Sequence, residues 1–292
     1  MSHATVIGPG ALGCLFAARL ARCGVKTTLV DYREERAAVL RKIGITVETA
    51  EETYTEKPAI ATRIPASCDF ILVLTKAHST RELRLPPKTP TLTLQNGLGN
   101  AETLAAAVGA SHVLAGATSE AATWLDVGRV RHAASGRTEF GAWTTCPADA
   151  PQASLQQAGF DISITESPGK TVWEKVVVNA GINPLTALLN VSNGALLEKR
   201  ETRELMRDLV VEATRVAGAE GYHFGHSLVE ETERICEATR DNISSMLQDI
   251  RQKRRTEIGA ISGEILRRGQ NAMLPTPRTK VIYQLVRALE AE

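Results

Sequence analysis

Short runs of apolar and β-branched residues alternate with helical patterns through the first half of the chain. We predict parallel strands at residues 4–8, 26–32, 70–76, 91–97 and 112–118. The remaining predicted elements are helices at 11–24, 33–44 and 153–159, antiparallel strands at 127–132 and 138–143, and a strand at 161–166. Strands that alternate with helices are typical of a mostly parallel sheet covered by helices on both faces. The first half is therefore predicted to be a doubly wound α/β domain.

The second half lacks this alternation. After the segment SPGK at residues 167–170, strand signals almost vanish, and helices are predicted at about 171–190, 198–221, 226–238 and 244–269. Such a change in composition and pattern marks a domain boundary. We therefore predict an α/β domain over residues 1–167 and an all-helical domain over residues 168–292.

One predicted helix carries a polar stripe on an otherwise apolar segment. In VWEKVVVNAGINPLTALLN, residues 172–190, the side chains of Lys175, Asn179 and Asn183 are four positions apart. Each step of four residues turns about 40° around a helix, so the three side chains share one face. Pro184 predicts that the helix is kinked or broken near Asn183. Buried amides need hydrogen-bond partners, which a bound ligand can supply.

Composition excludes several classes of partner. The net charge of +1 gives no electrostatic reason to expect binding to nucleic acid or to a membrane surface. The five cysteines and six histidines show neither C-x-x-C nor H-x-x-x-H spacing, so we expect no disulfide framework and no metal site. There is no signal-peptide pattern and no apolar run near the roughly 18 residues that span a bilayer. A cytoplasmic protein is expected, either a monomer or a homodimer.

A glycine motif follows the first predicted strand. In VIGPGALG, Gly8, Gly10 and Gly13 have G-x-G-x-x-G spacing at the start of a helix. In a Rossmann-type fold the first glycine allows a tight turn, the second lets the backbone approach a pyrophosphate, and the third allows the helix to pack closely on the strand. The cofactor-binding loop is predicted to comprise Gly8, Pro9, Gly10, Ala11, Leu12 and Gly13.

The nature of the dinucleotide depends on the end of the second strand. Asp31, 23 residues after Gly8, is placed to accept hydrogen bonds from the adenosine ribose and to repel a 2′-phosphate, which favours NAD. Arg33 can instead reach a 2′-phosphate, and Lys76 adds a cation at the rim where ligands bind in such sheets. Both NAD and NADP therefore remain open.

Two polar residues in the second half have competing interpretations. Ser245, with Gln248 three residues later, fits a capping box at a helix start, and a hydroxyl at that position also suits a substrate carboxylate. Glu257 lies twelve residues further on, about three turns along the predicted helix. A lone glutamate in a charged helix is usually solvated, so on pattern alone Glu257 is a surface residue.

The motifs GPGALG, LTK, LQNGLGN, WEKVVVNAGINPLTAL, SNG and SSMLQDIRQKRRTEI resemble those of ketopantoate reductases (2-dehydropantoate 2-reductases) in order and spacing. The resemblance covers essentially the whole chain. It implies a Rossmann domain joined to a helical domain like that of 6-phosphogluconate dehydrogenase. It also implies NADPH-dependent reduction of 2-dehydropantoate, a small 2-keto acid, to (R)-pantoate in the pathway to pantothenate and coenzyme A.

The resemblance assigns roles to individual residues. Lys175 matches the catalytic lysine that donates a proton to the ketone oxygen, and Glu257 matches a glutamate near the nicotinamide and the substrate hydroxyl. Asn96 matches an asparagine that serves cofactor and substrate. The other matching positions are Asn179, Asn183, Asn193 and Ser245 for the substrate, and Lys76 and Ala122 for the cofactor.

The chain also departs from the family pattern. Well-known members have an arginine just after the second strand, where this chain reads Asp31, Tyr32 and Arg33. After TEI the family continues with an acid, an aromatic residue and Asn-Gly, whereas this chain reads GAISG at 259–263. The alternatives are a reductase of another branched 2-keto acid or of an opine-type substrate, and, more remotely, a non-catalytic NAD(P)-sensing module.

Overall fold

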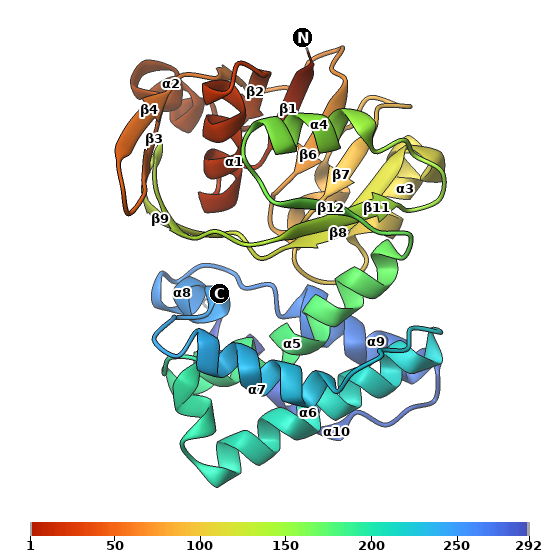
Figure 1. Ribbon diagram of the computed structural model, residues 1–292. Helices are drawn as coiled ribbons and strands as arrows, with labels where there is room; N and C mark the ends of the chain where they lie inside the picture. The colour runs from red at the N-terminus through yellow and green to blue at the C-terminus, as the bar shows by residue number, and fades with distance from the viewer. Residues whose placement is uncertain (1, 291–292) are drawn as a thin grey trace. The chain divides into compact units, whose positions relative to one another are not determined.

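The computed structural model describes residues 2–290 (Figure 1). The chain forms two compact units, one comprising Met1–Gln95 and Asn100–Thr171 and the other Asn96–Gly99 and Val172–Glu292. The domain boundary at 167/168, drawn from composition, stays a prediction.

The first unit is built on an eight-stranded sheet in the order β12-β11-β8-β7-β6-β1-β2-β5. Its strands are β1 (His3–Ile7), β2 (Lys26–Val30), β5 (Ala59–Ala61), β6 (Phe70–Val73), β7 (Thr91–Thr93), β8 (Val113–Thr118), β11 (Thr138–Ala142) and β12 (Ile162–Ile164). All neighbours from β5 to β8 are parallel, and β11 is antiparallel to β8. The chain turns to opposite sides of β1 to form β2 and β6, which makes the end of β1 the switch point where ligands bind in doubly wound sheets. The predicted α/β fold class is confirmed.

A second sheet of four strands, in the order β4-β3-β10-β9, was not expected as a separate layer. Its strands are β3 (Ile45–Glu48), β4 (Thr53–Glu56), β9 (Ala121–Asp126) and β10 (Arg129–Ala134). The helices of this unit are α1 (Ala11–Arg22), α2 (Glu34–Ile43), α3 (Asn100–Val108) and α4 (Asp149–Gln157), with 3₁₀ turns at Ala77–Glu82 and Ala110–His112. The antiparallel segments predicted at 127–132 and 138–143 exist as β10 and β11, but they belong to different sheets.

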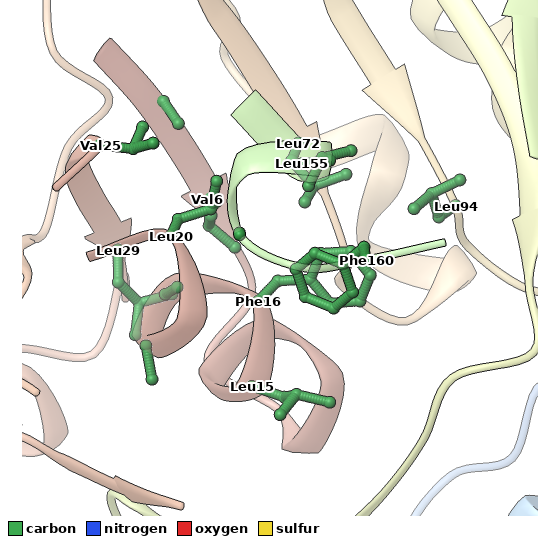
Figure 2. Close-up of a cluster of buried hydrophobic side chains, with 14 of the residues drawn as sticks. Val6, Leu15, Phe16, Leu20, Val25, Leu29, Leu72, Leu94, Leu155 and Phe160 are labelled. Atoms are coloured by element: carbon green, nitrogen blue, oxygen red, sulfur yellow. The ribbon is translucent and has the colours of Figure 1, made fainter. Parts of the chain in front are cut away.

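Helix α1 is buried because a sheet lies on each side of it. It contacts β1 and β2 of the large sheet and β3, β4, β9 and β10 of the small one. Leu15, Phe16 and Leu20 are fully buried, and the Phe16 ring stacks on Phe160 with the ring centroids 4.1 Å apart (Figure 2). This packing fixes the start of α1, and with it the glycine loop, against the end of β1.

The second unit is helical. Its elements are α5 (Pro168–Leu189), α6 (Arg200–Ala219), α7 (Leu228–Ala238), α8 (Ser245–Arg251), α9 (Glu264–Asn271) and α10 (Pro277–Leu289), with a 3₁₀ turn at Gly194–Leu197 and a π-helical turn at Gly259–Gly263. The predicted break near Asn183 was wrong, because α5 continues through Pro184 to Leu189, while the alternative of a kink there stays a prediction. The proline sits in a fully helical, buried stretch, where packing outweighs the lost hydrogen bond.

The single long helix predicted at 244–269 was also wrong. Helix α8 ends at Arg251, and Lys253 adopts a left-handed conformation with φ 52°. The Arg254 amide donates back to the Asp249 carbonyl at 2.8 Å, so the chain turns away from the helix axis. Glu257 consequently lies in an irregular segment before the π-helical turn, not on a helix face three turns beyond Ser245.

Between residues 2 and 290, no helix combines the length and apolar character needed to cross a membrane. The cytoplasmic location and the monomeric or dimeric state stay predictions.

Candidate functional site

The glycine loop has the geometry that a bound pyrophosphate requires. Gly8 adopts φ +106°, and a Cβ there would lie 2.7 Å from the backbone nitrogen of Thr75, just beyond β6. A Cβ on Gly13 would lie 1.8 Å from the Gly8 carbonyl oxygen, so helix and loop touch through backbone alone. A Cβ on Gly10 would meet nothing within 4 Å. Gly8 and Gly13 thus lack room for a side chain, and the space at Gly10 is open, while the binding of a pyrophosphate there stays a prediction.

The loop also presents a helix N-terminus. Gly10 is the N-cap of α1 and is exposed, and no side chain caps the helix there. Pro9 is buried, and Ala11 and Leu12 are partly buried and pack against the apolar core, which holds the loop in place. Backbone amides at such an end attract an anion. The residues present therefore fit a dinucleotide.

The Asp31 side chain is buried and paired with an arginine, whereas the sequence suggested that it faces the adenosine ribose. Its side chain is 1% exposed, and its two oxygens form a bidentate ion pair with Arg36 on α2, with Nη2 2.9 Å from Oδ1. The Arg33 backbone amide also donates to Asp31 Oδ1, at 3.1 Å. Arg36 was not among the predicted site residues, although a basic residue in the first turn of the helix after the second strand was a usable signal.

Two further predicted cofactor residues lie in the first unit. Lys76 follows β6, is partly buried, and precedes the 3₁₀ turn at Ala77–Glu82. Ala122 lies on β9 of the small sheet, opposite His132, and packs against the core that contains α1. Lys76 thus lies at the same end of the sheet as Gly8, whereas Ala122 belongs to the other sheet.

The second unit brings together three predicted residues, Lys175, Asn96 and Glu257. The Asn96 side-chain amide donates to Glu257 Oε2 at 3.1 Å, and Glu257 is 8% exposed. Burial lowers the pKa of the Lys175 ammonium to about 8, while the negative charge of Glu257 acts in the opposite direction. A partly buried lysine beside a carboxylate is a candidate acid for neutral pH.

Close packing fixes the position of Asn96. The segment Asn96–Gly99 belongs to the second unit, and the Leu98 amide donates to the Ala260 carbonyl at 2.9 Å. Gly97 has φ +91°, and a Cβ there would lie 2.5 Å from the Ala260 Cβ. The small residues of GAISG, which depart from the family pattern, thus allow the Asn96 segment to lie directly on the π-helical turn.

The polar stripe lies on a helix, as predicted, and that helix continues through Pro184 without a break. Lys175, Asn179 and Asn183 all lie on α5. Asn179 is partly buried, and Asn183 is 7% exposed. The stripe therefore carries the lysine and both amides in an environment where polar side chains need partners.

Asn193 has a local role that its pattern did not predict, and Ser245 lacks the one that was predicted for it. Asn193 is buried and donates through Nδ2 to Thr239 Oγ1 at 2.9 Å, while its Oδ1 has no hydrogen-bond partner within residues 2–290. Ser245 is exposed and is the first residue of α8. Its predicted capping role was wrong, because the N-cap is Ser244, whose Oγ accepts from the Leu247 amide at 3.1 Å.

Two family models cover nearly all of the chain. "Ketopantoate reductase PanE/ApbA" matches residues 4–145, and "Ketopantoate reductase PanE/ApbA C terminal" matches residues 169–290. A curated 2-dehydropantoate 2-reductase of Halobacterium salinarum is 36% identical over 299 residues, which cover 98% of each chain. The chain belongs to the ketopantoate reductase family. Another 2-dehydropantoate 2-reductase, from Listeria innocua, is 32% identical over 98% of this chain and 96% of its own.

Solved structures agree with the family assignment. A PanE/ApbA family ketopantoate reductase from Ralstonia eutropha JMP134 superimposes with a TM-score of 0.90 at 27% identity, covering 99% of this chain and 98% of that chain. A 2-dehydropantoate 2-reductase from Geobacter metallireducens GS-15 gives 0.89 at 28% identity, covering 98% and 99%. As a ketopantoate reductase family member, the chain is an NAD(P)-dependent oxidoreductase, and the resemblance inferred from its motifs is confirmed.

Proposed function

We propose that the protein reduces 2-dehydropantoate to (R)-pantoate, with Lys175 as the proton donor. The observation that carries this proposal is the group formed by Lys175, Glu257 and Asn96, with the lysine pKa lowered to about 8. It supports the reaction because reduction of a ketone needs a cation that can also release a proton at the ketone oxygen.

Lys175, Glu257 and Asn96 have different roles in the proposed reaction. A nicotinamide cofactor, when bound, would supply the hydride for the 2-keto carbon. Lys175 Nζ stabilises the negative charge on the ketone oxygen and transfers a proton to it, then regains a proton from solvent. Glu257 favours the charged form of the lysine, and Asn96 orients the Glu257 carboxylate through its 3.1 Å hydrogen bond.

The remaining polar residues would bind the substrate. Asn179 and Asn183 lie on the same stripe as Lys175, and their side-chain NH2 groups can donate hydrogen bonds to the substrate oxygens. The buried Oδ1 of Asn193 has no donor within the described residues, which a substrate hydroxyl would supply. Ser245 is exposed at the start of α8 and suits the substrate carboxylate.

We further propose NADPH as the preferred cofactor. Asp31 alone would repel a 2′-phosphate, but its charge is balanced by Arg36 and its side chain is almost fully buried. Arg33, exposed at the N-cap of α2, adds a second guanidinium at this end of β2. Guanidinium groups bind phosphate in a bidentate manner, so the local charge favours the phosphorylated ribose.

The test is an assay of the purified protein with 2-dehydropantoate and either NADPH or NADH, followed by the loss of reduced-cofactor absorbance. We expect turnover with both, a higher kcat/KM with NADPH, and (R)-pantoate as the product on chiral chromatography. The proposal would have to be abandoned if neither cofactor were oxidised.

A reductase of another 2-keto acid is the competing function. A D-mandelate dehydrogenase with NADH and anilino(oxo)acetate has a TM-score of 0.91 at 24% identity, so the same fold occurs in an enzyme named for a different 2-hydroxy acid. A panel of branched and opine-type keto acids separates the two, since a preference for a ketone without the 4-hydroxyl would favour the alternative. A non-catalytic NAD(P)-sensing module would have no use for a proton donor such as Lys175.

A further inference from the structure

The segment that carries Glu257 is tied to the C-terminal helix. Thr256, the residue before Glu257, is 3% exposed, and its backbone amide donates to Glu290 Oε1 at 2.8 Å. Its hydroxyl donates to the same oxygen at 2.6 Å. Glu290 lies just after α10, and its Oε2 is 2.9 Å from Arg287 Nη1. The carboxylate is therefore itself held in place.

Thr256 fixes the chain on both sides of Glu257. Its hydroxyl oxygen accepts a hydrogen bond from the Ile258 amide at 3.1 Å, while the hydroxyl donates a hydrogen bond to Glu290. The Glu257 carbonyl accepts from the amides of Ala260 and Ile261 at 3.0 and 3.1 Å, at the start of the π-helical turn. Without these bonds the irregular segment after α8 has no regular ladder of hydrogen bonds to define its conformation.

We propose that Thr256 and Glu290 are positioning residues that hold the Glu257 carboxylate in place to bond Asn96 and act on Lys175. This role rests on the reduction proposed above. The direction of the Glu257 side chain depends on the backbone at 256–258, and a misplacement of about 1 Å in a catalytic group can lower the rate by about 100-fold. Thr256 and Glu290 need not touch the substrate for this effect.

The same helix provides a matched control at its other end. Glu212 is 6% exposed and accepts from the Thr279 amide at 2.8 Å, the Thr279 hydroxyl at 2.6 Å and the Arg278 amide at 3.0 Å. This carboxylate thus binds a threonine as Glu290 does, but the threonine is not next to a candidate site residue. Glu212 and Glu290 share the structural role, and only Glu290 has the positioning role.

The experiment compares Glu290→Ala and Thr256→Val with Glu212→Ala and Thr279→Val in the full chain. All four variants are expected to unfold at lower urea concentration than the wild type. Only the first pair is expected to lower kcat, by about 10- to 100-fold, with a smaller change in KM. In that pair the alkaline limb of the pH profile should also move to lower pH, because a displaced Glu257 no longer supports the charge on Lys175.

Glu290→Gln is expected to restore most of kcat, because an amide oxygen still accepts both hydrogen bonds from Thr256. Wild-type kcat and pH profile in folded Thr256→Val would overturn the positioning role, and so would the same alkaline shift in Glu212→Ala. Lys175→Ala separates this result from failure of the proposed function. If Lys175→Ala retains turnover, the proposed site is wrong. If Lys175→Ala is inactive while Thr256→Val keeps the wild-type kcat and pH profile, only the positioning role of Thr256 and Glu290 is refuted.

Discussion

The lowered pKa of Lys175 predicts a specific pH dependence of keto-acid reduction. With a pKa of about 8, the ammonium is about 90% charged at pH 7 and about 10% charged at pH 9. Only the charged form can donate a proton, so kcat/KM should fall about tenfold over this interval. A lysine with an ordinary pKa of about 10.4 would remain almost fully charged at pH 9, and the rate would stay flat.

The assay measures kcat/KM for 2-dehydropantoate at saturating NADPH between pH 6 and 10, because this parameter reports the state of the enzyme before the keto acid binds. Glu257→Gln removes the negative charge that raises the Lys175 pKa against the effect of burial. The alkaline limb of the pH profile of this variant should therefore move below pH 8. Lys175→Arg should be slower but flat over the range, since a guanidinium does not lose its proton there.

Two results would refute this reasoning. A wild-type profile that stays flat beyond pH 9.5 would mean that burial does not lower the lysine pKa, or that proton transfer does not limit the reaction. A limb near pH 8 that persists in Lys175→Arg would assign the titration to a different group. A primary isotope effect with deuterated NADPH, measured at both ends of the range, is the control that chemistry remains rate-limiting.

Three further predictions concern Arg36, Gly97 and Lys175. Arg36→Ala should leave the Asp31 carboxylate without its ion-pair partner, so that it repels a 2′-phosphate. The ratio of kcat/KM with NADPH to kcat/KM with NADH should then fall by about tenfold or more, which corresponds to about 1.4 kcal/mol. Adding Asp31→Asn to this variant should reverse the change. Gly97→Ala should destabilise the fold by roughly 2 kcal/mol in urea unfolding because its Cβ collides with Ala260, and Ala260→Gly in the same chain should recover part of this. Lys175→Met should abolish turnover yet raise the unfolding free energy at pH 7 by roughly 1 to 3 kcal/mol. The native state disfavours the charged lysine, so this gain should shrink as the pH rises from about 8 towards 10.5, and an equal gain at both pH values would contradict it.

Local periodicity was sufficient for the elements that carry strong patterns. The glycine loop could be located because a strand, three spaced glycines and an apolar helix occur together. The stripe on α5 could be derived from the four-residue spacing alone. By contrast, β3 and β4 have only four residues each, and β9 has no fully buried residue, so no local pattern indicated a second sheet.

The errors in the second half came from non-local contacts. Helical composition continues from residue 244 to 269, but Lys253 takes a left-handed conformation and Thr256 bonds to Glu290, 34 residues away. Pro184 predicted a kink or a break, and the buried surroundings of α5 prevent the break. The Asp31–Arg36 pair is local, yet the choice of Arg36 rather than ribose as the partner of Asp31 depends on side-chain direction, which spacing does not reveal.

The burial of α1 between two sheets has a thermodynamic consequence. The helix that packs Phe16 at the centre of the first unit also begins at Gly10, so the cofactor loop and the apolar core belong to one cooperative element. A ligand that binds only this ordered loop adds about 2.7 kcal/mol to the stability of the unit at 100 times its dissociation constant. In the cell, the supply of nicotinamide cofactor would therefore influence both the rate at which the enzyme works and the fraction of the chain that is folded.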